Sequence, residues 1–354
     1  MAEFLETTPL RDALDDALQS APLSSAGDIG GQRPRRAAPV GSDFVRRVHS
    51  YEVLNQYVVG GQWRALALAS AASIIEVTDN RRQVLRYWVY RSLALMRMGA
   101  QAQAERELAR LATSIRVSQW PFELRVLRAQ ATSSAMVSAD RLSALLRACR
   151  RSLPVDQQRV FRVSLMLARC AMELRGDSAL ALRIVDQLTA TGDDPLVMSA
   201  AARLCLQLGA IPKAEALFVA VENMAPSVDD TLVRMNRALY AVAAGKWAAA
   251  RELFDAVAEA HPPGEGAGGV AAGNNRALCD LYLGNPQAML SGLQKLMGDA
   301  PAAAGASEVL VFNYCTGLDL HYDGGRLRDA KTKKLVEVAT WAGDGFDVAS
   351  FKLT

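Results

Sequence analysis

The residue types that most often perform catalysis or bind metals are few in this sequence and stand far apart. The 354 residues include only three histidines, His49, His261 and His321, and their spacing suggests neither a catalytic triad nor a metal site. His261 ends a predicted helix, where an imidazole interacts well with backbone carbonyls, so we interpret it as structural. The cysteines are also widely spaced and form no CxxC pair, which predicts reduced, buried, cytosolic thiols. They are Cys149, Cys170, Cys205, Cys279 and Cys315.

One glycine string matches a nucleotide-binding motif but lacks its context. Gly264, Gly266 and Gly269 form GxGxxG. The dinucleotide-binding version follows a β-strand, whereas this string follows Pro262 and Pro263, so we interpret it as an insertion between repeats. Neither GxSxG nor GxxxxGK[ST] occurs in the sequence. The sequence therefore predicts a protein that is not an enzyme and that uses no cofactor or metal.

Charge and hydropathy exclude further classes. A net charge of only +3 argues against a dedicated nucleic-acid binder. No charge-free apolar run reaches the roughly 18 residues of a membrane span, and the acidic start MAEFLETTPLRDALDD does not resemble a secretion signal. We therefore expect a cytoplasmic protein that does not insert into membranes. Two short basic clusters are interpreted as solvated surface: Arg33, Arg35 and Arg36, and Arg147, Arg150 and Arg151.

Asn236 and Asn275 occupy the same place in two similar stretches, MNRAL and NNRAL, which lie 39 residues apart. Arg237 and Arg276 follow them. On the concave face of a helical repeat array, such amides can hold the backbone of a bound peptide, and the arginines can supply surface charge. A clamp for a carboxylate would need further converging Lys and Arg, and it is incomplete here. Internal packing of the asparagines is the alternative that we favour over a peptide role.

The elements that position these residues are predicted from glycines at regular intervals. Gly61, Gly99, Gly176, Gly209, Gly245 and Gly284 are separated by 38, 77, 33, 36 and 39 residues, where 77 is about two units with one glycine missing. Periods of this size indicate stacked helix-turn-helix units. Because 51% of residues are hydrophobic but only 6% are aromatic, the core consists mainly of Ala, Leu and Val, which suits closely packed helices.

The second helix of each unit follows one pattern. After Gly245 come Ala250, Phe254 and Val257, and after Gly209 come Ala214, Phe218 and Val221. The small alanine lets two helices approach closely, and the larger side chain fills the space between repeats. This is the tetratricopeptide (TPR) pattern. We predict an all-α, TPR-like solenoid of about seven to eight antiparallel helix pairs in a right-handed superhelix: seven pairs over residues 45–301, including one in 120–155, and an eighth from Ser307.

The two ends of the chain differ from the repeats. Residues 1–41 are rich in Ser, Gly and Pro and predict a largely disordered tail with one short amphipathic helix; residues 42–354 form the solenoid. Residues 302–354 predict a divergent capping unit, with a turn at Gly324 and Gly325 and then a helix that carries Leu335, Val338 and Trp341 on one side. Its polar face holds a lysine cluster: Lys331, Lys333 and Lys334.

Several stretches resemble a specific family, subunit twelve of the trafficking protein particle (TRAPP) complex. They are Gln62-Trp63-Arg64-Ala65 and residues 87–105, 204–222 and 273–284. The ending is the most specific: Leu310-Val311-Phe312-Asn313, Thr316, Lys333-Lys334, Gly343-Asp344-Gly345-Phe346 and Phe351-Lys352-Leu353. The resemblance runs from about residue 45 to the end. The loops are shorter than in the animal members, and the N-terminal tail is brief where those members carry a long extension.

The resemblance implies a non-catalytic scaffold subunit of a TRAPP III-type complex, a tether and nucleotide-exchange factor for a Rab-family GTPase in ER-to-Golgi traffic and autophagy. Implied partners are the large accessory subunits and small core subunits, in a hetero-oligomer on ER-Golgi and Golgi membranes. We expect contacts at the C-terminal end, where Phe346, Phe351 and Leu353 are candidate anchors. In the alternative, this tail only caps the last helix. A free-standing TPR adaptor that binds extended peptides in its groove is the second functional hypothesis.

Overall fold

In a computed structural model of the chain, residues 48–77, 80–173, 178–190, 194–225, 227, 230–261 and 267–353 are described. The predicted tail, the cluster of Arg33, Arg35 and Arg36, the turn at Gly176, and Gly264 and Gly266 of the GxGxxG string lie outside these residues. Within the described part, every regular element is a helix. The predicted all-α fold is confirmed.

The described residues form eight helical hairpins in chain order, as the glycine spacing predicts. They are α2 (Tyr51–Val59) with α3 (Trp63–Glu76), α4 (Arg81–Arg97) with α5 (Gln101–Ser114), α6 (Phe122–Gln130) with α7 (Ala135–Arg151), α8 (Gln157–Glu173) with α9 (Ser178–Thr189), α10 (Pro195–Gln207) with α11 (Ile211–Met224), α12 (Thr231–Ala243) with α13 (Trp247–Ala260), α14 (Ala267–Tyr282) with α15 (Pro286–Asp299), and α17 (Glu308–His321) with α18 (Gly324–Ala339). Short helices complete the described part: η2 (Val117–Gln119), α16 (Pro301–Ala304) and η3 (Val348–Phe351).

The turn glycines end the first helix of a hairpin. Gly209 has a φ of 73°, a left-handed conformation that residues with a Cβ rarely adopt. Around it, the Ala210 N–H donates to the Cys205 carbonyl over 2.9 Å and the Gly209 N–H donates to the Leu206 carbonyl over 3.0 Å. This pair of bonds satisfies carbonyls that the helix end leaves free. The same positive φ recurs at Gly61, Gly99, Gly245 and Gly284.

The predicted small and large positions of the second helices lie in the core. Ala214 and Phe218 of α11 and Ala250 and Phe254 of α13 are all buried. Packing joins the two helices of a hairpin and also joins each hairpin to the next, as α13 with α14 shows. The hydrophobic core of the described residues is divided into five clusters along the array, each formed within and between neighbouring hairpins, as expected of a solenoid in which each repeat contacts its neighbours.

The hairpin without a turn glycine is present where it is predicted. Leu124 and Leu127 of α6 and Leu142, Leu146 and Cys149 of α7 are all buried. Its connection contains Ser134, whose side chain accepts a hydrogen bond from the Val137 N–H and caps α7. A serine cap thus starts the second helix of this unit.

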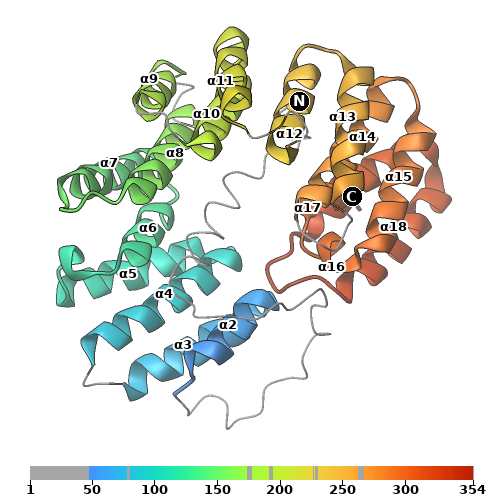
Figure 1. The fold of residues 1–354 in the computed structure, drawn as a ribbon. Coiled ribbons are helices and arrows are strands. Elements are labelled where there is room, and N and C mark those ends of the chain that lie inside the picture. The colour runs from blue at the N-terminus through green and yellow to red at the C-terminus, as the bar shows by residue number, and fades with distance from the viewer. Residues whose placement is uncertain are drawn as a thin grey trace.

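The hairpins follow a curved path on which first helices such as α6, α8 and α10 lie nearer the centre of the array than α7, α9 and α11 (Figure 1). The path bends far enough to bring the last hairpin beside the first (Figure 1). The Asp344 N–H donates to the Gly61 carbonyl over 3.0 Å, and the Arg64 N–H donates to Oδ2 of Asp344 over 3.0 Å. The described array therefore closes into a ring.

Candidate functional site

Asn236 lies between two hairpins. It is only 1% exposed. Its Oδ1 accepts hydrogen bonds from Oγ of Ser199 over 2.8 Å and from Nη2 of Arg203 over 3.1 Å, both on α10. In the structure they hold the Asn236 amide to the preceding hairpin, where it is enclosed by protein.

Asn275 belongs to a second buried amide group. Nδ2 of its neighbour Asn274 donates to Oδ1 of Asn275 over 3.3 Å, and Nδ2 of Asn313 on α17 donates to Oδ1 of Asn274 over 3.0 Å. All three side chains are buried. Sequence reasoning missed the pair of Asn274 with Asn313. The sequence signal for this pair is the offset of 39 residues between Asn274 and Asn313, which equals the interval between Asn236 and Asn275.

Arg237 and Arg276 reach backwards to the second helix of the preceding hairpin. Nε of Arg237 lies 2.7 Å from Oε1 of Glu222 on α11, and Nε of Arg276 lies 3.2 Å from Oδ1 of Asp255 on α13. Both arginines stand eight residues before a turn glycine, and so does Arg91. The ion pairs of Arg237 and Arg276 therefore each tie one hairpin to its predecessor.

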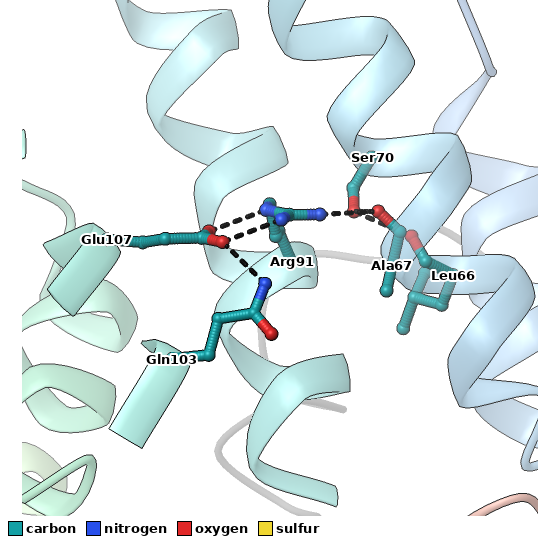
Figure 2. Close-up of polar contacts among 6 residues, drawn as sticks. All are labelled: Leu66, Ala67, Ser70, Arg91, Gln103 and Glu107. Atoms are coloured by element: carbon teal, nitrogen blue, oxygen red, sulfur yellow. Dashed lines mark hydrogen bonds and ion pairs between the residues drawn. The ribbon is translucent and has the colours of Figure 1, made fainter. Parts of the chain in front are cut away.

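Arg91 on α4 has a different carboxylate partner, which lies on the second helix of its own hairpin. Its guanidinium donates to both carboxylate oxygens of Glu107 on α5, over 2.6 and 2.7 Å, and to the Ala67 carbonyl on α3 over 3.0 Å (Figure 2). Gln103 also donates to Glu107. Burial opposes ionisation of Glu107, but hydrogen bonds from Arg91 and Gln103 outweigh it and lower the pKa of this carboxyl. The arginine thus joins three helices of two hairpins.

The C-terminal unit departs from the prediction in its lysines. Lys331 is 4% exposed and Lys334 is 8% exposed, so the predicted polar face of the capping helix is wrong for these two residues. Nζ of Lys331 lies 2.5 Å from Oδ1 of Asp319 and donates to the Lys352 carbonyl over 2.8 Å. Nζ of Lys334 pairs with Glu337 and lies 5.2 Å from the centre of the Tyr314 ring. These partners, on α17, on α18 itself and in the tail, make the burial possible.

The boundaries of that helix also differ. α18 begins at Gly324, which has a φ of 59°, so the predicted turn residues start the helix. It ends at Ala339, and Trp341 lies beyond it in the following turn. There the Trp341 backbone approaches Gly305, where an added Cβ would lie 2.5 Å from the Trp341 carbonyl carbon. Beyond the end of α18, the chain therefore packs closely against Gly305, the residue that follows α16.

The three predicted anchors have different environments. Phe351 on η3 is 1% exposed and packs into the core of the last two hairpins, with Phe346 partly buried beside it. Their ring centres are 6.1 Å apart. Leu353 is 43% exposed. In this conformation the Phe351 side chain belongs to the end cap, and Leu353 is the anchor that faces solvent.

The remaining chemical candidates are separate from one another. Nε2 of His261 is 2.7 Å from Oγ1 of Thr231, so its partner is a hydroxyl rather than the predicted helix-end carbonyls. All five cysteines are free; four are buried and Cys170 is half-buried. Arg147, Arg150 and Arg151 are exposed. Among the described residues, no group of three or more His, Cys, Asp or Glu is placed to hold a metal, and none of the helices there is long and apolar enough to cross a membrane.

The sequence is similar to two curated proteins, both named trafficking protein particle complex subunit 12. The mouse protein is 28% identical over 210 residues, covering 57% of this chain and 25% of the relative. The human protein is 24% identical over 327 residues, covering 78% of this chain and 43% of the relative. The chain thus spans between a quarter and a half of these relatives. No protein-family profile matches it.

Two solved structures are also similar to the chain. A tetratricopeptide repeat protein from Parabacteroides merdae is 13% identical, with a TM-score of 0.48, covering 74% of this chain and 99% of that one. The Cut9–Hcn1 hetero-tetramer of APC/C is 12% identical, with a TM-score of 0.39, covering 85% of this chain and 54% of that one. The repeat architecture itself follows from the glycine turns and hairpins described above. The chain is an all-helical, TPR-like solenoid that is similar in sequence to subunit 12 of the trafficking protein particle complex.

Proposed function

We propose that the chain is a non-catalytic scaffold subunit of a TRAPP III-type complex, which tethers vesicles and exchanges nucleotide on a Rab-family GTPase in ER-to-Golgi traffic and autophagy. The observation that carries the proposal is the similarity to the human subunit 12 across 78% of the chain. An array of helical hairpins supports it, because such arrays offer large surfaces for protein contacts. The chain then works in the cytoplasm and reaches ER-Golgi and Golgi membranes through the complex, in a hetero-oligomer with large accessory and small core subunits.

Purification of the tagged chain from its native cell tests this proposal. We expect near-stoichiometric recovery of small core trafficking subunits together with other large accessory subunits, identified by mass spectrometry. Recovery of the chain alone, or with chaperones and scattered clients, would overturn the scaffold role and favour the peptide adaptor. The buried positions of Asn236 and Asn275 give the adaptor no support in this conformation.

Within this function, we place the contact with other subunits at the last hairpin and its tail. Four apolar side chains there are exposed: Leu320, Val336, Val348 and Leu353. Burial of exposed apolar side chains in a protein contact is favourable. Among the predicted anchors, Leu353 is the one available for such a contact without unfolding the cap.

A surface substitution tests this placement. Leu353→Asp adds a charge at an exposed side chain, so we expect loss of subunit co-purification with unchanged helicity by circular dichroism. Ile75→Asp is the control, because Ile75 on α3 is equally apolar and 72% exposed but lies in the first hairpin. Equal co-purification of both variants and the wild type would refute the C-terminal contact.

A further inference from the structure

Residues 343–346 form the loop that joins the two ends of the array. They follow α18, yet their backbone lies against the turn between α2 and α3. An added Cβ on Gly343 would lie 3.0 Å from the Gly61 carbonyl oxygen, and one on Gly345 would lie 1.9 Å from the Arg97 carbonyl oxygen. The second distance is too short for any side chain. Only glycine at position 345 permits this approach between hairpins that are more than 240 residues apart in the chain.

Asp344 supplies a side-chain cap for the N-terminus of α3 in the first hairpin. α3 begins after Gln62, whose side chain makes no capping hydrogen bond. The Asp344 carboxylate instead accepts the Arg64 N–H at 3.0 Å. A helix N-terminus has unpaired N–H groups and a partial positive charge, so a carboxylate is well suited to it. The cap of this helix therefore comes from a residue 280 positions away.

The contact is confined to a small region. The helix pairs that pack most extensively in the described part are neighbours along the chain, such as α3 with α4 and α13 with α14. Asp344 makes two hydrogen bonds that join the two ends, and Gly343 and Gly345 approach the first two hairpins closely. The extensive contacts between neighbouring helices do not involve this loop.

We propose that residues 343–346 are a reversible latch: docked on the first hairpin they hold the solenoid as a closed ring, and released they open it between the first and last hairpins. In the open form, a partner segment reaches the inner helices from the side. The docked loop thus controls access to the face that the first helices line. This inference does not depend on the TRAPP assignment.

Two variants of the full chain test the latch. Gly345→Ala places a Cβ against the Arg97 carbonyl, and Asp344→Ala removes the carboxylate that accepts the Arg64 N–H. Gly325→Ala is the matched control, because a Cβ at Gly325 on α18 meets no atom within 4 Å. The measurements are amide hydrogen exchange of residues 61–64 and 343–346, the radius of gyration from small-angle X-ray scattering, and molar mass from light scattering.

We expect both latch variants to remain helical monomers with a larger radius of gyration. Exchange in both segments should rise by about tenfold or more in Gly345→Ala, which corresponds to about 1.4 kcal/mol, and the control should match the wild type. Should Gly345→Ala fail to fold, Asp344→Ala decides the matter by the same readouts. Unchanged exchange and radius in a folded latch variant would refute the proposal. A wild-type dimer that docks the loop of one copy on the other would also refute it.

Discussion

Lys331 and Asp319 form a largely buried ion pair, and substitution of one member should destabilise the protein more than substitution of the other. The Lys331 side chain is 5% exposed and that of Asp319 is 29% exposed, and Nζ and Oδ1 are 2.5 Å apart. Removal of one member of a buried ion pair costs about 3–5 kcal/mol, because the other charge stays in the interior without compensation. Since water reaches Asp319 and the Lys352 carbonyl still accepts from Nζ, we expect Asp319→Asn to cost about 2 kcal/mol, below that range.

The reverse substitution should cost much less. Lys331→Met replaces a buried ammonium by an apolar side chain of similar length, and it leaves Asp319 paired with Lys352, whose Nζ is 3.0 Å from Oδ2. Replacement of a buried charge by a well-packed apolar group is often neutral or stabilising. We therefore expect Lys331→Met to stay within about 1 kcal/mol of the wild type, and the double variant to recover most of the loss in Asp319→Asn.

Amide exchange over residues 308–353, together with urea unfolding followed by circular dichroism, measures these effects. The exchange readout is needed because the terminal hairpin of a repeat array can open by itself. Equal losses in Asp319→Asn and Lys331→Met would refute the reasoning, since they would show that the pair acts through packing and not through an uncompensated charge.

The ion pair of Lys331 and Asp319 also makes the stability of the last hairpin depend on pH. Burial opposes the ionised form of Asp319, but the hydrogen bonds and charges of Lys331 and Lys352 outweigh it and lower the pKa of this carboxyl. Its contribution to stability is therefore complete above the unfolded-state pKa of about 3.9 and is lost as the pH falls through the lower folded-state pKa. Exchange in the last hairpin should accelerate in that acid range in the wild type, and Asp319→Asn should lack this component.

Two further predictions concern the core. Phe254 is fully buried, so Phe254→Ala should lower the free energy of unfolding by about 3–5 kcal/mol in urea titrations. Ile75→Ala, at an exposed position, should change it by less than about 0.5 kcal/mol. Similar values for both variants would contradict the observed core. Burial raises the pKa of Cys279 to about 12 and that of Cys315 to about 11. A thiol reagent at pH 8 should therefore modify half-buried Cys170 first and the buried cysteines only after unfolding. Fast labelling of every thiol in the native protein would refute this assignment.

The sequence predicts features that depend on near neighbours in the chain. The positive φ at Gly209 and the burial of Ala214 and Phe218 follow from one hairpin and its contact with the next. The same reasoning placed a hairpin in residues 120–155 without a turn glycine, because apolar spacing alone indicates which side of each helix is buried. Local periodicity was therefore sufficient to predict the number of hairpins.

Features that depend on the curvature of the whole array were not predictable in this way. Whether Asn236 faces a groove or a neighbouring hairpin depends on the rotation between successive hairpins, and the irregular glycine spacing leaves that rotation open. The burial of Lys331 requires Asp319 on the preceding helix and a backbone carbonyl of the tail, which no helical pattern in α18 reveals. Closure of the ring sums all of these rotations, so the contact of Asp344 with Gly61 emerges only from the complete structure.

Four positions of the ending that carries the family resemblance now have a physical explanation. Gly345 is required because the loop backbone meets the Arg97 carbonyl, and Asp344 is suited to its place because it caps α3. Phe346 packs beside Phe351, and Phe351 is buried in the core of the last hairpins. A chain that shared only the repeats would still stack hairpins, but its first helix pair would lack a partner at the far end. The closing loop is therefore what makes this array a ring rather than an open superhelix.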